Sequence, residues 1–273
     1  MATMQDKIDD LRQRRQQALL GGGAAKLEKQ HQAGKLTARE RVAALVDEGS
    51  FDEVGLFATH RSTLFGMDGK TLPADGVVTG AGAIGGRLVH LASQDFTVSG
   101  GSAGEMHSIK VAEIMHQSLK TGSPFIFIND SGGARVQEGI DSLSGYGKVF
   151  HANVLLSGAV PQISLICGPC AGGAAYSPAL TDFIIQTRQA QLFITGPQVI
   201  RQVTGETVTA EQLGGPDSHM ALSGVIHFIA EDDRHAILLC QKLLSFLPAN
   251  NLEDPPQLDG DRTVDPNLRL ETL

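Results

Sequence analysis

The stretch Ile166-Cys-Gly-Pro-Cys-Ala-Gly-Gly-Ala-Ala-Tyr-Ser177 decides the fold of this chain. Residues 161–166 form a short apolar run typical of a buried strand, and the small residues at 171–180 favour a closely packed helix. Glycines at such a turn let the backbone approach a ligand, and the free N–H groups of a helix's first turn favour negative charge. The pattern predicts an oxyanion-binding turn at Gly172 and Gly173. The simpler alternative is that these glycines only allow close packing of helix against strand.

The same plan of strand, glycine turn and helix occurs one unit earlier in the chain. Residues 124–130 have the apolar character of a buried strand, and they run into Ser131-Gly-Gly-Ala-Arg135 and a predicted helix. Successive strand–helix units joined by right-handed crossovers tend to place equivalent turns at the same end of a sheet. Amides of Gly133 or Ala134 and an amide of the later glycine turn are therefore expected to converge on one oxygen atom.

The remaining segments predict a mixed α/β chain with a helical N-terminal arm. Charged segments with apolar residues on one face predict helices over 6–20 and 38–46, the second opened by a capping box of Thr37 and Glu40. Two β-rich runs flank Gly85-Gly86 and predict a hairpin. The further predicted elements are strands at 76–83, 87–98, 182–186, 190–196 and 224–230, and helices at 105–121, 209–213 and 232–247.

Composition limits the classes of function. A hydrophobic content of 41% supports a real core, and a formal net charge of −8 argues against nucleic acid or an anionic membrane as a partner. Residues 1–7 show no apolar core like that of a signal peptide, and no apolar run is long enough to span a bilayer, so a cytoplasmic protein is expected. We expect a helical arm at 1–50, a main domain at 51–249 and a linker or tail at 250–273. The arm is expected to be a solvated face with a docking stripe and to take no direct part in chemistry.

Cys167-Gly-Pro-Cys170 offers a redox alternative at the later glycine turn. Cys-x-x-Cys at a helix N-terminus is the thioredoxin arrangement, in which the helix dipole lowers the pKa of a thiol. The motif lies in the middle of a long glycine-rich chain and lacks the aromatic residue expected beside an exposed redox turn, so two buried structural cysteines are favoured. With three cysteines and no second Cys-x-x-Cys, neither a disulfide framework nor a zinc site is indicated, and no metal is expected.

Two earlier glycine motifs suggest other activities. Gly100, Ser102 and Gly104 match the nucleophile elbow of serine hydrolases, and His107 follows as a candidate partner. No Asp and His can be singled out for a triad, so an ordinary strand-to-helix turn is the favoured interpretation. The glycines of 80–85 match G-x-G-x-x-G, but a strand is predicted after them where a dinucleotide fingerprint needs a helix.

Seven motifs along the chain are specific enough to point to a family. They are Phe51-Asp-Glu-Val-Gly, Thr63-Leu-Phe-Gly-Met-Asp, Pro73-Ala-Asp-Gly-Val-Val-Thr-Gly, Ser93-Gln-Asp-Phe-Thr-Val, Asp130-Ser-Gly-Gly-Ala-Arg, Gln137-Glu-Gly-Ile-Asp-Ser-Leu-Ser-Gly-Tyr-Gly and Gly168-Pro-Cys-Ala-Gly-Gly-Ala-Ala-Tyr-Ser-Pro-Ala-Leu-Thr-Asp-Phe. In this order they resemble the N-terminal half of biotin-dependent acyl-CoA carboxyltransferases. The resemblance covers nearly the whole chain and is strongest to propionyl-CoA carboxylase β subunits and methylmalonyl-CoA carboxyltransferase central subunits.

The resemblance implies a crotonase-like α/β fold, a superhelix of stacked β-β-α units that binds an acyl-CoA. In that family a carboxyl group moves between carboxybiotin and the α-carbon of propionyl-CoA or a similar short acyl-CoA. Backbone amides stabilise the enolate of the thioester, one such donor contributing about 3 to 4 kcal/mol. Gly172 and Gly173 match the family's thioester oxyanion turn, and Gly133 and Ala134 match the turn that faces the acyl or carboxyl group.

The resemblance also implies contacts with the coenzyme A thioester. The residues expected to make them are Gly132, Arg135, Ala171 and Tyr176. For Arg135 the alternatives are to attract an anion, to brace its loop or to lie at the surface.

The chain departs from the family in length. Family members carry a second, similar half that supplies the biotin pocket and a second oxyanion hole from a neighbouring subunit. The implied partners are a C-terminal carboxyltransferase half and a protein that carries biotin, in a homo- or hetero-oligomer. Two alternatives stay open: biotin-independent decarboxylation of malonyl- or methylmalonyl-CoA, and a non-catalytic acyl-CoA-binding or assembly module.

Overall fold

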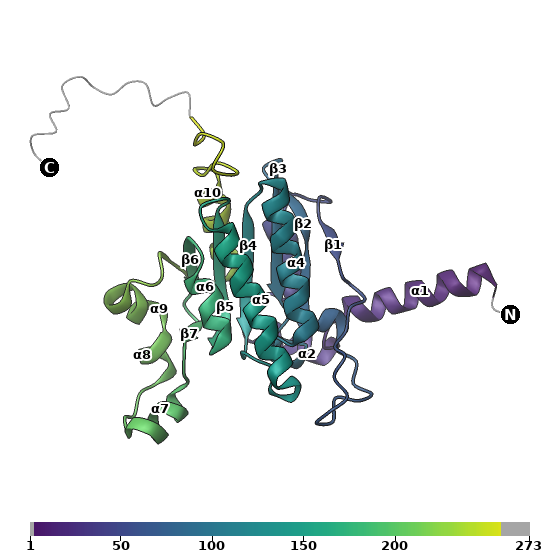
Figure 1. Cartoon of the computed structure of the whole chain (residues 1–273), viewed down its shortest axis with the longest axis horizontal. Coiled ribbons are helices and arrows are strands. Elements are labelled where there is room, and N and C mark those ends of the chain that lie inside the picture. Colours follow the sequence, from purple (N-terminus) through teal and green to yellow (C-terminus); the bar gives the residue numbers. More distant parts are fainter. Residues whose placement is uncertain (1–2, 258–273) are drawn as a thin grey trace, which may run out of the picture.

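In the computed structural model, which describes residues 3–257, an eight-stranded mixed sheet lies between two layers of helices (Figure 1). The strands are β1 (Asp52–Val54), β2 (Val77–Ile84), β3 (Arg87–Gln94), β4 (Phe125–Ser131), β5 (Gln162–Ala171), β6 (Phe183–Thr187), β7 (Gln191–Phe193) and β8 (Phe228–Ala230). Their spatial order is β1-β2-β3-β4-β5-β6-β8, and β7 pairs with the end of β5. Pairing is antiparallel from β1 to β3 and parallel from β3 to β8. The carboxyl ends of β4, β5 and β6 therefore meet at one edge.

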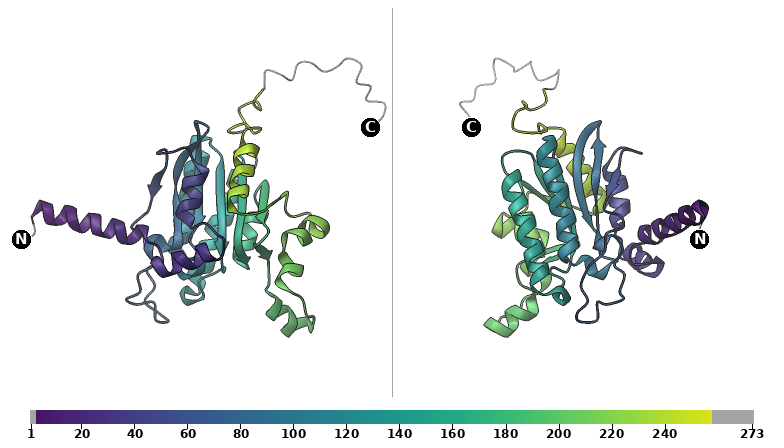
Figure 2. Two further views of the ribbon diagram at one scale, coloured as in Figure 1. Left: turned by 180° about the vertical axis from the view of Figure 1, so that it is seen from behind. Right: turned by 45° about the vertical axis from the view of Figure 1, so that its right-hand side comes forward.

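Helices cover both faces of the sheet. The helices are α1 (Met4–Leu19), α2 (Ala24–Gln32), α3 (Ala38–Leu45), α4 (Glu105–Thr121), α5 (Ile140–Leu156), α6 (Gly173–Ala179), α7 (Pro197–Thr204), α8 (Ala210–Gly214), α9 (Pro216–Ser218) and α10 (Asp233–Leu244). In Figure 2, α4 and α5 lie over one face, and α3 and α10 lie over the opposite face. Within residues 3–257, no helix is both long enough and apolar enough to cross a bilayer.

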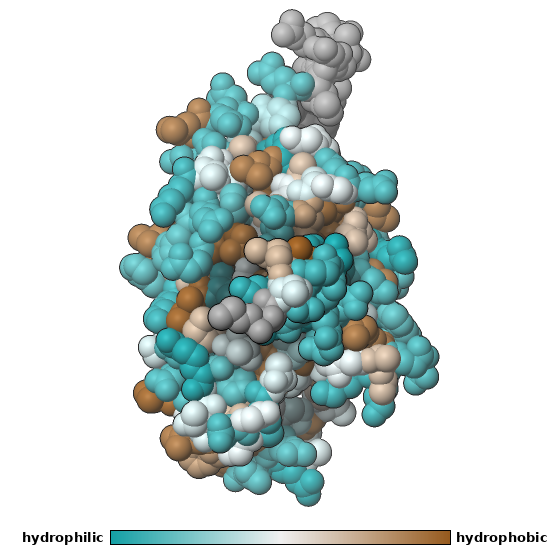
Figure 3. Space-filling view, turned by 90° about the vertical axis from the view of Figure 1, so that its right-hand side faces the viewer, coloured by the Kyte–Doolittle hydropathy of each residue, from teal (hydrophilic) through white to brown (hydrophobic). Residues whose placement is uncertain are grey.

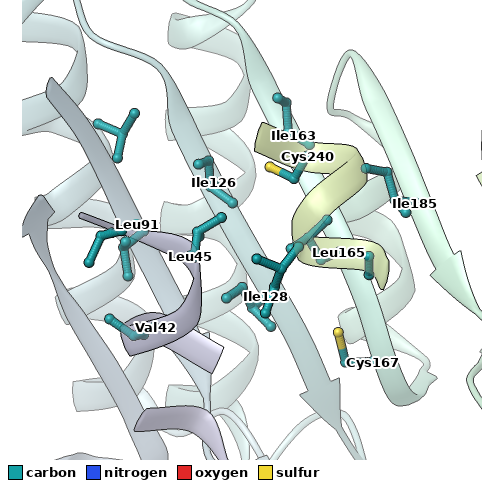
Figure 4. Close-up of a cluster of buried hydrophobic side chains, with 14 of the residues drawn as sticks. Val42, Leu45, Leu91, Ile126, Ile128, Ile163, Leu165, Cys167, Ile185 and Cys240 are labelled. Carbon is teal, nitrogen blue, oxygen red and sulfur yellow. The ribbon is translucent and has the colours of Figure 1, made fainter. Parts of the chain in front are cut away.

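The core alternates along β4 between the two layers. Ile126 and Ile128 pack against α3 and α10, whereas Phe125 and Phe127 pack against α4 and α5. Figure 4 shows the first of these clusters, to which α3 contributes Leu45. Because both faces of β4 are buried, its sequence reads as a continuous apolar run rather than an alternating one.

The N-terminal arm is divided between core and surface. Helix α3 begins with the predicted capping box of Thr37 and Glu40, and its apolar face packs into the main core. Helix α1 has no buried residue and projects from the body (Figure 1). Figure 3 looks onto this side and shows a largely hydrophilic surface with scattered apolar residues. The division at residue 50 stays a prediction, and α3 shares its core with the residues that follow.

Most of the predicted elements are confirmed, including the hairpin of β2 and β3 and the bounds of α4. Three differ. Strand β5 continues through the Cys-x-x-Cys segment to Ala171, so α6 begins only at Gly173. Strand β8 is limited to three residues, 228–230, and β3 ends at Gln94 rather than at 98. The short strand β1 and the helices α2, α7 and α9 were not predicted. Of the predicted tail, residues 258–273 lie outside the described residues.

Candidate active site between two glycine turns

The two glycine turns lie side by side, as predicted. Strands β4 and β5 are parallel neighbours, and each runs into its turn at the same edge of the sheet. The turns are in close contact, since a Cβ atom on Gly133 would lie 2.6 Å from the carbonyl oxygen of Ala171. Glycine is also required at position 133 by its φ of +98°.

Hydrogen bonds within the protein already engage two of the four predicted amide donors. The N–H of Gly172 donates to the carbonyl of Phe193 at 3.1 Å, and the N–H of Gly133 donates to Ser131 Oγ at 3.1 Å. Among the hydrogen bonds within residues 3–257, none uses the N–H of Gly173 or of Ala134. One amide in each turn is thus left without a hydrogen-bond partner among the described residues.

An isolated β-bridge between Ala103 and Ala134 sets the direction of the Ala134 amide. Ala103 donates to the carbonyl of Gly133 and accepts from the N–H of Arg135, both at 2.9 Å. Backbone groups of successive residues in extended chain point to opposite sides. The N–H of Ala134 consequently points away from Ala103.

Arg135 braces the first turn from inside the protein. Its side chain is 1% exposed, so the surface alternative is wrong. The guanidinium donates to Asp75 Oδ1 at 2.5 Å, Glu138 Oε1 at 2.7 Å and the carbonyl of Ser102 at 2.7 Å. Weaker bonds to the Asp75 carbonyl and Ser102 Oγ engage its two other N–H groups. Direct contact with coenzyme A would require the guanidinium to give up some of these hydrogen bonds. The geometry therefore supports the bracing role.

The segment that Arg135 holds has an unusual backbone. Ala74 and Asp75 are non-glycine residues with φ of 50° and 47°, and Asp75 is fully buried. Such conformations cost about 1 to 3 kcal/mol each and persist where the surroundings enforce them. Burial raises the pKa of the Asp75 carboxyl above its ordinary value, an effect that Arg135 opposes.

His107 lies on the other side of Asp75. Its backbone N–H donates to Asp75 Oδ2 at 2.7 Å, and its Nδ1 lies 2.9 Å from the Asp75 carbonyl oxygen. Burial, reinforced by the charge of Arg135, lowers the pKa of His107 to about 3. The ring is therefore neutral near pH 7 and serves as a hydrogen-bonding spacer behind the first turn.

An aromatic row supports the second turn. A Cβ atom on Gly173 would lie 2.9 Å from the ring of Tyr146, so the helix can approach that ring only with glycine there. The ring of Tyr146 packs on Phe150 with centroids 5.7 Å apart, and Phe150 packs on Tyr176 at 5.9 Å. Tyr176 is 40% exposed at the end of this row, where a ligand can reach it.

The other residues predicted to contact coenzyme A are placed as follows. The N–H of Gly132 donates to the carbonyl of Gly100 at 2.9 Å, so its amide is occupied. Ala171 ends β5, with its carbonyl beside Gly133. Gly132 and Ala171 both lie where the two turns meet. Their contact with coenzyme A stays a prediction.

The competing chemistries do not fit the geometry. Cys167 and Cys170 are free and buried, as favoured above, and burial raises the pKa of both thiols, opposite to the requirement of a redox turn. Ser102 Oγ donates to the carbonyl of Ser99 at 2.8 Å, and His107 is engaged by Asp75, so neither forms a triad. Within the described part of the chain, no three His, Cys, Asp or Glu side chains are grouped to hold a metal ion.

Sequence reasoning missed an ionic cluster behind the turns. Asp130 Oδ2 accepts from Lys35 Nζ at 2.6 Å and from Arg41 Nη1 at 2.9 Å, and Arg41 Nε donates to Asp233 Oδ2 at 2.8 Å. The partners are 89 and 192 residues apart for Arg41, so no local pattern links them. The only signal in the sequence was an aspartate directly before a glycine turn.

The family model and the similar proteins found for this chain agree with one another. The family model of the carboxyl transferase domain matches residues 29–272. The chain is 62% identical over 272 residues to the methylmalonyl-CoA carboxyltransferase 12S subunit of Propionibacterium freudenreichii subsp. shermanii, covering 100% of this chain and 52% of that protein. It is 54% identical to the methylmalonyl-CoA decarboxylase subunit alpha of Veillonella parvula, covering 100% of this chain and 53% of that protein.

A solved structure extends the likeness to three dimensions. The transcarboxylase 12S crystal structure, described as a hexamer assembly with methylmalonyl-coenzyme A and methylmalonic acid bound, aligns with a TM-score of 0.93 and 64% identity. The alignment covers 95% of this chain and 51% of that chain. The chain thus spans about half the length of these relatives.

Proposed function

The chain belongs to the carboxyl transferase domain family, and from this premise we propose that it is the acyl-CoA-binding half of a biotin-dependent carboxyltransferase. Its crotonase-like fold is confirmed by the close superposition on transcarboxylase 12S. The proposed reaction moves a carboxyl group between biotin and propionyl-CoA or a similar short acyl-CoA. The observation that carries the proposal is the pair of unengaged amides on Gly173 and Ala134, one at each neighbouring glycine turn.

These amides suit the charge that develops in such a reaction. When the bond between the α-carbon and the carboxyl group of methylmalonyl-CoA breaks, its electron pair moves onto the thioester oxygen as an enolate. Preorganised N–H donors aimed at that oxygen stabilise the negative charge without having to reorganise, and this lowers the barrier. In the reverse direction the α-carbon of propionyl-CoA would lose its proton, for which biotin freed of its carboxyl group would be the acceptor, and the same donors would stabilise the resulting enolate. Biotin on a partner protein would supply or accept the carboxyl group.

The proposal includes partners that complete the site. We assign the biotin pocket and the second oxyanion hole to a C-terminal half, because the relatives are about twice as long as this chain. A biotin carrier protein would deliver the carboxyl group, and the assembly would be a homo- or hetero-oligomer. We also propose that this assembly acts in the cytoplasm.

Decarboxylation is a second candidate, which the identity to a methylmalonyl-CoA decarboxylase subunit favours. Cleavage of the same carbon–carbon bond would form the same enolate, which a proton would then quench. Both activities use Gly173 and Ala134, and they differ in what accepts the carboxyl group.

The first experiment separates these activities from a binding module. The purified chain is incubated with methylmalonyl-CoA and with propionyl-CoA, and binding and carbon dioxide release are followed with and without biotin and a relative's C-terminal half. Turnover that needs the added half and biotin supports carboxyl transfer, and turnover by the chain alone supports decarboxylation. Binding without turnover under every condition contradicts the proposal and indicates a non-catalytic module.

Replacing Gly173 tests the site itself. Gly173→Val should lower turnover by about 100- to 1000-fold, the usual effect of losing one oxyanion donor, because its side chain displaces the turn from Tyr146. The matched control is Gly147→Ala on α5, where a Cβ atom meets no neighbour within 4 Å. Circular dichroism should show both variants folded, and turnover retained by Gly173→Val would exclude its amide as a donor.

A further inference from the structure

Strand β5 is bulged directly before the second glycine turn. Asn129 of β4 pairs with Ile166 of β5, whereas Ser131 pairs with Cys170, so Asp130 faces residues 167–169. A bulge bends its strand and changes the direction of everything that follows. Here the residues that follow are Ala171 and the second turn, so the form of the bulge sets the direction of the Gly173 amide.

Groups from the N-terminal arm occupy this bulge. Arg41 Nη2 donates to the carbonyl of Cys167 at 3.2 Å, which gives this bulge carbonyl a partner from the arm. A Cβ atom on Gly168 would lie 1.9 Å from Asp130 Oδ1 and 2.6 Å from Lys35 Nζ. The space beside Gly168 is therefore filled by a carboxylate of β4 and an ammonium of the arm.

The charges of the cluster balance in a nearly dry environment. Two cations, Lys35 and Arg41, face two anions, Asp130 and Asp233, and the side chains are exposed by 14%, 1%, 0% and 5% respectively. Asp233 also accepts from the backbone N–H of Leu36 at 2.8 Å, which fixes the arm to the start of α10. Loss of one partner from such a cluster leaves a buried charge without compensation, which is strongly destabilising. The ion pairs therefore hold the four side chains firmly in place.

Asp130 connects the cluster to both turns. It is followed directly by Ser131 and the first glycine turn, and its carboxylate lies against Gly168 in the bulge that leads to the second turn. A change in its position would therefore move the Ala134 and Gly173 amides relative to each other. A misplacement of about 1 Å can cost about 100-fold in rate.

We propose that Lys35 and Arg41 are positioning residues for the site, which act through Asp130 and the β5 bulge to set the mutual direction of the Gly173 and Ala134 amides. This inference rests on the proposed function. It gives the N-terminal arm a part in the chemistry, where the sequence predicted only a solvated docking face.

Lys35→Met is the variant that tests the proposal, since Lys35 lies at the edge of the cluster and its loss disturbs the core less than loss of Arg41. Lys29→Met, an exposed lysine on the same arm, is the matched control, and Lys35→Arg is the conservative rescue. The full chain is titrated with coenzyme A and with a nitronate analogue of propionyl-CoA, which carries negative oxygen where the enolate oxygen would lie. The ratio of the two affinities reports the alignment of the amides, and thermal unfolding reports stability separately.

The wild-type chain should prefer the nitronate, and Lys35→Met should reduce this preference about tenfold or more while coenzyme A binds unchanged. Lys29→Met should keep the preference, and Lys35→Arg should restore part of it. If Lys35→Met keeps the full preference and only unfolds at a lower temperature, the cluster is merely structural and the inference is overturned while the proposed function stands. If the wild-type chain shows no preference, the proposed function fails, and the positioning role fails with it.

Discussion

The two glycine turns share one sequence pattern but are supported in different ways. The first, at residues 131–135, is tied from within by the buried Arg135, whose bonds reach the strained segment at 73–76 and the loop at 99–104. The second, at residues 171–174, is held by a backbone bond to β7 and by the arm's ionic cluster behind the β5 bulge. Two neighbouring turns of one sequence pattern can thus be held in place by contacts that come from unrelated parts of the chain.

The largest difference between the turns should appear when the clamp of the first is removed. Arg135→Met leaves Asp75 and Glu138 buried without their cation, and this should lower the free energy of unfolding by about 3 to 5 kcal/mol. The control is Arg188→Met, which removes exposed ion pairs to Asp217 and Glu231 and should cost at most about 1 kcal/mol. Urea denaturation measures the free energy of unfolding of both variants. Equal losses would contradict the bracing role of Arg135.

A smaller effect should distinguish the glycines themselves. Gly172→Ala strains a residue with φ of 59° but meets no atom closer than 3.9 Å, so it should cost about 1 to 3 kcal/mol. Gly133→Ala should cost more, because it adds a backbone clash at 2.6 Å to its own positive φ. Gly147→Ala in α5 should instead stabilise the chain by about 0.5 to 1 kcal/mol. Denaturation midpoints give the order, and a larger loss for Gly172→Ala would reverse the comparison.

Acid should weaken the support of the first turn. The pKa of His107 is lowered to about 3 in the folded chain, so below its ordinary value of 6.5 only the unfolded chain binds the proton. This part of the stability is complete above pH 6.5 and falls by about 1.4 kcal/mol per pH unit as the pH drops toward 3.

The raised pKa of Asp75 acts in the opposite sense near its own titration, so the contribution of His107 is isolated by a variant. Unfolding of the wild-type chain and of His107→Gln is compared from pH 7 to pH 4.5. The difference in stability between them should shrink as the pH falls. A difference that is independent of pH would show that His107 titrates normally in the folded chain.

Local patterns predicted most of the fold. The capping box at Thr37, the hairpin around Gly85-Gly86 and the two strand–glycine–helix units depend on neighbours within a few residues, and all are confirmed. The candidate turns were also predicted, because glycine pairs after apolar strands restrict the backbone to few conformations. The seven motifs were specific enough to identify the family.

The remainder depends on contacts between distant residues. Which amides are free is decided by Phe193 and by the side chain of Ser131, which no spacing rule places near the turns. The burial of Arg135 follows from Asp75, 60 residues earlier in the chain. The extension of β5 through Cys167 to Ala171 was missed because Gly168 and Pro169 weaken the strand pattern, while pairing with β4 and β7 maintains it.

The ionic cluster also bears on the order in which the parts of the chain fold. Arg41 leaves the ribosome long before Asp130 and longer still before Asp233, its partner 192 residues later. The ion pair of Arg41 with Asp233 can therefore form only after the start of α10 has been synthesised, so the cluster is completed no earlier than that. Contacts of such long range are slow to form. The complete cluster should accordingly form late, so that a partly made chain can have strands β4 and β5 before it has all four charges behind the two turns.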